Sequence, residues 1–158
     1  MKKKLTVAIL YLAVILNSYA GEKTHKKEYS LDEKGYVGNV GLSLSSGAMY
    51  SIGGSLTTSH GYSFGNGLWM GGGLSLLWPF DEAPVVPVFA EAKYAFDLGK
   101  VNPFAACKIG VGIGGGEQPL GYVSPSFGVD YGRWSFFASY DAMDVVKFAS
   151  FGFAWNFR

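Results

Sequence analysis

The sequence is poor in cysteine, in charge and in long apolar stretches. Cys107 is the only cysteine, so no internal disulfide can form, and a lone cysteine between apolar neighbours is better explained as a small hydrophobic side chain than as a reactive thiol. Charged residues make up only 16% of the chain. No apolar run of 18 residues follows Ala20, which excludes a membrane-spanning helix in that part of the sequence.

The first 20 residues have the pattern of a secretory signal peptide. Three lysines at positions 2–4 precede an apolar run from Leu5 to Leu16, and small residues at Ser18 and Ala20 mark a cleavage site. The run is too short to cross a bilayer as a helix, so a removable leader is favoured over an uncleaved anchor. The residue directly after the cleavage site is Gly21 and not a cysteine, which excludes a lipoprotein.

The chain after the leader carries little net charge. Removing three of the 13 basic residues leaves ten against 12 acidic ones, a net charge of −2, so nothing basic remains to hold nucleic acid. Residues 21–35 mix lysines with acids and lack apolar periodicity, which predicts a polar, solvated N-terminal arm before a single domain of residues 36–158. A partner-binding role for the arm is the less ordinary interpretation.

The final stretch, Val146 to Arg158, alternates aromatic residues with small or polar ones. One face carries Ala149, Phe151, Phe153, Trp155 and Phe157, and the other carries Ser150, Gly152, Ala154 and Asn156. Successive side chains of a strand point to opposite sides, and the second face is too small and too polar for a convincing water-facing surface opposite an aromatic core. The pattern is typical of a strand whose aromatic face contacts lipid.

From Tyr36 onward the sequence falls into short alternating segments separated by turn-forming residues. Eight strands are predicted, at 36–45, 49–59, 67–78, 86–96, 101–113, 121–131, 134–141 and 146–158. A membrane form must be a closed barrel, because only helices and closed barrels satisfy every backbone polar group in lipid. With both termini in the periplasm, the turns at 60–66, 97–100 and 132–133 face the periplasm, and those at 46–48, 79–85, 114–120 and 142–145 face out.

Four charged residues lie well inside the predicted strands: Glu91, Lys93, Lys108 and Asp130. The register points all four into the lumen, because an ionised group facing lipid near the midplane would cost about 2–4 kcal/mol. Glu91 and Lys93 share one strand and Lys108 lies on the next, so cross-strand salt bridges are expected. The cluster is favoured as a polar plug, since about eight strands leave room only for side chains. A conduit or ligand site stays open as the alternative, because many lumen positions are glycine.

Other patterns that suggest chemistry have simpler explanations, and no catalytic residue, cofactor site or metal site is predicted. Gly110, Gly112 and Gly115 match a dinucleotide-binding spacing, but that motif needs a helix to begin there, and a strand end with a loop explains the glycines. His60 follows Ser59 but has no acid nearby in sequence, and a periplasmic turn or aromatic packing accounts for it. Two acid pairs in outside loops are a poor calcium signal: Asp81 with Glu82, and Asp141 with Asp144.

The leader, the alternating strands and the aromatic last strand together resemble the small outer-membrane β-barrels of bacteria, the OmpA/OmpX/OmpW-like superfamily. The resemblance covers Tyr36 to Phe157, and the last strand is similar to the C-terminal insertion signal of such proteins, with the departure that Arg158 follows Phe157. The stretch Thr57 to Tyr62, followed by a glycine-rich strand, is similar to exported barrels of unknown function in Bacteroidota. The resemblance implies a fold and a place, and no substrate site carries over.

The sequence therefore predicts an all-β, eight-stranded antiparallel up-and-down transmembrane barrel in the outer membrane of a Gram-negative bacterium. We expect a monomer with a non-enzymatic structural or surface-interaction role, whose partners are outer-membrane lipid, lipopolysaccharide and, through the last strand, the barrel-assembly machinery. A narrow conduit or binding barrel for a small molecule is the main alternative. A soluble, lipocalin-like barrel would need polar residues on the lipid-facing positions, and a lipid-modifying enzyme would depend on His60.

Overall fold

Eight strands make up most of the chain that the computed structural model describes, namely residues 31–47, 52–79, 83–98, 100–114, 118–144 and 146–158. The strands are β1 Lys34–Gly47, β2 Gly53–Phe64, β3 Leu68–Pro79, β4 Val85–Ala95, β5 Val101–Gly114, β6 Leu120–Tyr131, β7 Trp134–Met143 and β8 Val146–Phe157. Within these ranges, no helix is long and apolar enough to cross a membrane.

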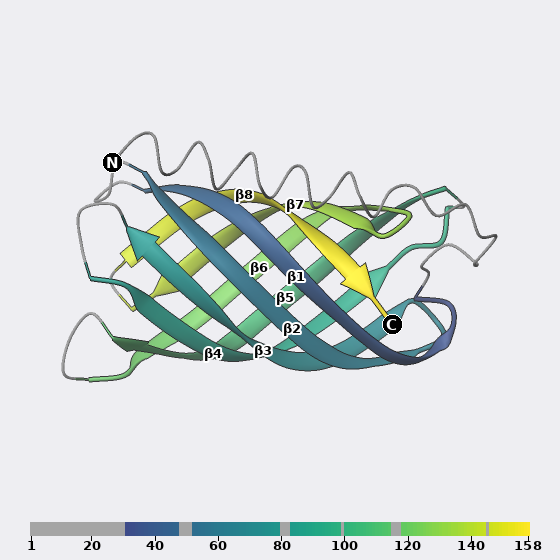
Figure 1. The fold of residues 1–158 in the computed structure, drawn as a ribbon, viewed down its shortest axis with the longest axis horizontal. Helices are drawn as coiled ribbons and strands as arrows, with labels where there is room; N and C mark the ends of the chain where they lie inside the picture. The colour runs from purple at the N-terminus through teal and green to yellow at the C-terminus, as the bar shows by residue number, and fades with distance from the viewer. Residues whose placement is uncertain (1–30, 48–51, 80–82, 99, 115–117, 145) are drawn as a thin grey trace.

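The strands close into one antiparallel barrel in sequence order, and β8 returns to pair with β1 (Figure 1). A path that starts at Val37 and steps from each residue to its partner on the next strand returns to β1 at Gly47 and not at Val37. The strands are therefore staggered and tilted, as closure of a barrel requires. β1 begins and β8 ends at the same end, which we call the terminal end, and the opposite end is the far end. The predicted fold class is confirmed.

The two faces of the strands differ as the alternation predicted. On the outside, Phe127 and Phe151 are each 70% exposed, and Ile109 is 62% exposed. On the inside, Ser59 and Ser63 are fully buried together with most other polar side chains of the strands. An apolar exterior around a polar interior is the reverse of a soluble barrel and is the arrangement of a barrel that faces lipid. It argues against the lipocalin-like alternative.

Interior glycines make room for aromatic side chains. The indole of Trp69 lies over β2 and β3, where a Cβ added at Gly61 or Gly71 would come within 2.7 Å of its ring. Trp69 is 2% exposed, and its Nε1 donates a hydrogen bond to the carbonyl of Val37 at 3.2 Å. These glycines are therefore explained by packing, without a ligand.

An apolar cluster lies inside the barrel toward each end. The terminal-end cluster consists of Leu31, Val37, Trp69, Ala95, Phe104 and Ala106. The far-end cluster consists of Leu77, Val85, Phe89, Tyr122 and Met143. Polar side chains lie beside the terminal-end cluster as well: Ser63 hydrogen-bonds the carbonyl of Leu31, and the Lys93 ammonium lies 3.9 Å from the centre of the Phe104 ring.

The residues just before β1 are attached to the barrel, although residues 21–35 were predicted to form a solvated arm. Leu31 is 3% exposed, and the Ser63 hydroxyl donates a hydrogen bond to its carbonyl at 2.7 Å. Arg158 Nη1 lies 2.9 Å from Glu33 Oε2, and Arg158 Nη2 donates to the Glu33 carbonyl at 2.8 Å. Residues 21–30 lie outside the described residues. Arg158 thus connects the end of β8 to the segment just before β1, across the closing strand pair.

The boundaries of β2 differ most from the prediction. The strand continues to Phe64 instead of ending at Ser59, and its turn to β3 covers only residues 65–67. The glycine and serine in this stretch suggested a turn, but pairing with β1 on one side and β3 on the other extends the strand. The other boundaries differ by a few residues at most, and the connections at both ends of the barrel are short.

Candidate functional site in the barrel interior

A buried ion pair joins β4 to β6 inside the lumen. Lys93 Nζ lies 2.8 Å from Asp130 Oδ2, and the two residues are 8% and 4% exposed. They come from strands that are not neighbours, because β5 lies between them. The residue of β5 that faces Lys93 is Ala106, whose small side chain lets the lysine reach across, and the ammonium lies 3.9 Å from the centre of the Phe104 ring.

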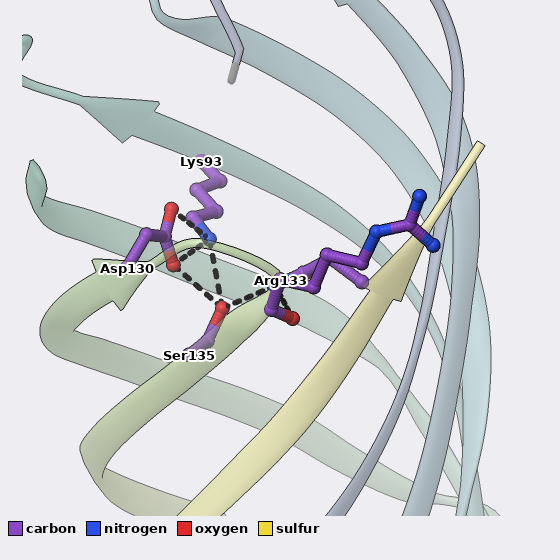
Figure 2. Close-up of polar contacts among 5 residues, drawn as sticks. Lys93, Asp130, Arg133 and Ser135 are labelled. Carbon is purple, nitrogen blue, oxygen red and sulfur yellow. Dashed lines mark hydrogen bonds and ion pairs between the residues drawn. The ribbon is translucent and has the colours of Figure 1, made fainter. Parts of the chain in front are cut away.

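Two polar side chains extend this ion pair to β7 and β8 (Figure 2). The Ser135 hydroxyl donates to Asp130 Oδ1 and lies 3.5 Å from Lys93 Nζ. Asn156 Nδ2 donates to Ser135 Oγ at 2.7 Å and to the carbonyl of Arg133 at 3.1 Å. The network therefore connects four strands, β4, β6, β7 and β8, near the terminal end. Figure 2 also shows that the guanidinium of Arg133 points away from this network.

A second buried carboxylate, Asp141, lies on the inner face of β7. It is 5% exposed and accepts hydrogen bonds from three hydroxyl groups: Tyr122 at 2.8 Å, Ser139 at 3.0 Å and Ser150 at 2.7 Å. The expectation that Asp141 lies with Asp144 in an outside loop was wrong, because β7 continues to Met143. The alternation of β7 already placed Asp141 on the lumen face, and that signal could have found it.

Glu91 and Lys108 face each other across β4 and β5, but they do not form the salt bridge that was expected. They are direct register partners, yet no ion pair within 4.0 Å joins them in the described structure. Glu91 Oε2 instead accepts a hydrogen bond from Ser59 on β2 at 2.7 Å, over the glycines of β3. Lys108 Nζ lies 5.1 Å from the centre of the Phe89 ring and 5.9 Å from that of Phe137.

A cavity of about 40 Å³ remains in the lumen between these groups. Its lining includes Thr57, Glu91, Lys93, Lys108, Ser126 and Asn156. A water molecule needs roughly 10–15 Å³ on this measure, so the space suits about three waters. Binding pockets for small organic ligands are commonly about 300–1,000 Å³. The four predicted residues all point inward, and the structure brings two of them, Lys93 and Asp130, into direct contact.

His60 lies on the outer face of β2, within the strand and not in the turn that was predicted. The Tyr36 hydroxyl bonds its Nδ1, and Thr58 Oγ1 lies 3.0 Å from its Nε2. Its ring also packs edge-on against Phe157, with the ring centres 5.9 Å apart. Both ring nitrogens thus contact neutral hydroxyls at the seam between β8, β1 and β2, and no carboxylate of the described chain hydrogen-bonds to the imidazole, so the geometry is one of packing.

The remaining candidates fall on strands, on a turn or outside the described residues. Gly110 and Gly112 lie within β5, where no helix begins, so they form no dinucleotide-binding turn. Asp144 forms the turn to β8, and its carboxylate accepts a hydrogen bond from the Gly121 amide at 3.3 Å. Within the described ranges, no three His, Cys, Asp or Glu side chains come together as metal ligands. Gly115, Asp81 and Glu82 lie outside the described residues.

The fold is that of small outer-membrane β-barrels of known structure. The β-barrel domain of Pseudomonas aeruginosa OprF matches with a TM-score of 0.54 at 13% identity, covering 79% of this chain and 100% of that one. Neisserial surface protein A matches with a TM-score of 0.55 at 19% identity, covering 77% and 96%. Ail of Yersinia pestis, in a complex with the heparin analogue sucrose octasulfate, matches with a TM-score of 0.51 at 16% identity, covering 79% and 99%.

A designed protein has the same fold as these natural barrels. The designed transmembrane barrel TMB2.3 matches with a TM-score of 0.52 at 12% identity, covering 80% of this chain and 98% of that one. No family model and no curated protein matches the sequence. The chain is therefore an eight-stranded barrel of the transmembrane class, and its activity has to be argued from its own residues, because one fold serves many functions.

Proposed function

We propose that this protein is a filled, non-conducting and non-enzymatic barrel of the Gram-negative outer membrane, with a structural or surface-interaction role. The observation that carries the proposal is the buried Lys93–Asp130 network in a lumen that holds an apolar cluster toward each end. An open conduit needs a continuous polar path, and the cavity that the described lumen residues enclose around Glu91 and Lys108 has room for about three waters. The alternative of a small-molecule conduit would require these contacts to separate.

The exterior supports insertion into lipid as a monomer. Apolar side chains cover the outward face of every strand, and the closed sheet leaves no edge strand free for pairing with another chain. We propose that residues 1–20 direct export and are cleaved, that the last strand contacts the barrel-assembly machinery, and that membrane lipid and lipopolysaccharide surround the barrel.

The far end limits what a surface partner can be. Its four connections, residues 48–52, 80–84, 115–119 and 144–145, contain four acidic residues and no lysine or arginine. Ail has been solved with a sulfated sugar analogue, but an anionic ligand of that kind would be repelled by acidic connections. A neutral or cationic surface is the better electrostatic match.

Fractionation and conductance test the proposal together. Expressing cells are separated into periplasm, inner membrane and outer membrane, and the detergent-extracted protein is run on gels with and without boiling. We expect a band in the outer-membrane fraction that shifts on heating. In planar bilayers we expect no stable conductance from the purified protein, with a porin that gives channels under the same conditions as the positive control. A soluble periplasmic protein would overturn the membrane assignment, and regular single-channel steps would overturn the filled lumen.

A further inference from the structure

A belt of outward-facing aromatic side chains surrounds the terminal end of the barrel. It is formed at the strand ends by Tyr36, Tyr62, Phe64, Tyr94, Phe96, Tyr131, Trp134, Trp155 and Phe157. Tyrosine and tryptophan with an apolar body and a polar edge concentrate at the level of lipid headgroups. At the far end, the described outward face has fewer such residues, among them Trp78 and Tyr140. The belt therefore marks the headgroup level at the terminal end.

One cation, Arg133, lies directly on this belt. It is exposed in the two-residue turn between β6 and β7, and its guanidinium carbon lies 5.6 Å from the centre of the Trp155 ring. Trp155 packs edge-on against Trp134 with the ring centres 5.1 Å apart. The other exposed cations that the structure describes at this end lack one of these features: Arg158 is paired with Glu33, and no aromatic ring of the described residues lies under Lys34 or Lys100.

The backbone of Arg133 is held by the interior network while its side chain lies outside. Asn156 donates to the Arg133 carbonyl through both its main-chain nitrogen, at 2.8 Å, and its Nδ2, at 3.1 Å. Gly132 adopts a positive φ of 55°, which tightens the turn. Figure 2 shows the guanidinium pointing away from the buried polar groups. No carboxylate in the described structure lies within ion-pair distance of the guanidinium, so it is available to an anion from outside.

An apolar column continues from Arg133 into the lipid-facing band. The register pairs Trp134 with Trp155, and the next outward pairs are Phe136 with Phe153 and Ala138 with Phe151. Phe136 is 51% exposed. The surface thus presents a cation at the end of the strands, aromatic rings beside it and apolar side chains farther along the strands. This order matches the anionic headgroup and the acyl chains of a phospholipid.

We propose that Arg133, Trp134 and Trp155 bind the headgroup phosphate of a membrane phospholipid whose acyl chains lie along the apolar column of β7 and β8. The inference rests on the proposed location in a membrane. Arginine suits a phosphate because its planar fork donates two parallel hydrogen bonds, and the indole rings beside it shield these bonds from water. The barrel would then carry a preferred lipid at one position of its belt in addition to the surrounding bilayer.

Tryptophan quenching tests the site, in a background with Trp69→Phe and Trp78→Phe so that the two belt tryptophans report. The protein is inserted into vesicles of digalactosyldiacylglycerol, which has no phosphate, and brominated phosphatidylglycerol is added in small fractions. We expect half-maximal quenching at a lipid fraction at least fivefold lower than for Arg133→Gln. Lys100→Gln is the matched control and should behave like the parent, and brominated galactolipid should quench all three proteins equally.

Superimposable quenching curves for the parent and Arg133→Gln would overturn the site. Displacement of the brominated lipid by millimolar glycerol phosphate would overturn the assignment to a lipid. Arg133→Lys keeps the charge without the fork and should fall between the parent and Arg133→Gln, so it also serves if the glutamine variant does not insert. If the parent inserts and shifts on heating but its quenching equals that of Arg133→Gln, only the lipid site is refuted. If the parent does not insert, the membrane assignment is refuted.

Discussion

Lys93 and Lys108 lie on neighbouring strands and both point into the lumen, yet their surroundings differ. Lys93 is 8% exposed and pairs with Asp130 at 2.8 Å. Lys108 is partly exposed and lines the lumen cavity, where its ammonium lies near two aromatic rings and forms no ion pair with its register partner Glu91 in the described structure. A buried ammonium needs an opposite charge, whereas one beside a wet cavity can keep part of its hydration. The region around Lys93 therefore holds strands together, and the region around Lys108 accommodates water.

The largest effect is expected when Lys93 is removed. Lys93→Met leaves Asp130 buried without its cation, which should lower the free energy of unfolding by about 3–5 kcal/mol. Urea titration of the barrel in phospholipid vesicles measures this loss. The double variant Lys93→Met/Asp130→Leu removes both charges and should recover most of the stability. If the single and double variants were equally unstable, the ion pair would not be the cause.

A smaller loss is expected at Asp141, which pairs with no cation in the described structure. Tyr122→Phe removes one of the three hydroxyl donors to Asp141, and a hydrogen bond to a charged acceptor contributes about 1.5–3 kcal/mol. The same urea titration applies. Tyr140→Phe, on the outward face of β7, is the matched control and should change little. Equal stability of Tyr122→Phe and the parent would show that the remaining serines satisfy Asp141.

Lys108→Met tests the other half of the comparison. Because Lys108 has no ion pair in the described structure, its loss should cost less than about 1 kcal/mol, the scale of its ring contacts. The measurement compares the free energies of unfolding of Lys108→Met and Lys93→Met in the same vesicles. A loss as large as that of Lys93→Met would mean that Lys108 is paired with Glu91, directly or through ordered water.

The smallest effect is expected outside the lumen. Glu33→Gln removes the partly exposed ion pair with Arg158, which should cost below about 1 kcal/mol and fade as salt is added. The midpoint temperature of the heat-induced gel shift, measured at low and at high salt, gives both the loss of stability and its salt dependence. Lys100→Gln, at an exposed cation in the connection from β4 to β5, is the control for a general charge effect. A loss that does not change with salt would show that hydrogen bonding, not charge, holds Arg158 to the segment before β1.

The faces of the strands could be predicted from sequence because the alternation has a period of two residues and is local. Phe151, Phe153 and Trp155 are each two residues apart, so any strand through them has one aromatic face. The same rule placed Glu91, Lys93, Lys108 and Asp130 inside before any partner was known. Strand ends were harder, as β2 shows, because glycines that allow a turn also fit under the Trp69 ring.

Which interior charges meet was decided only by the closed tertiary structure. Lys93 and Asp130 are far apart in sequence and lie on strands that do not pair, so their contact depends on barrel curvature and on the small Ala106 between them. The expected pairing of Glu91 with Lys108 followed from register alone, but Ser59 reaches Glu91 across the glycines of β3. The two-residue period of the sequence determines whether a side chain points inward or outward, and the shape of the closed sheet determines which side chains it contacts.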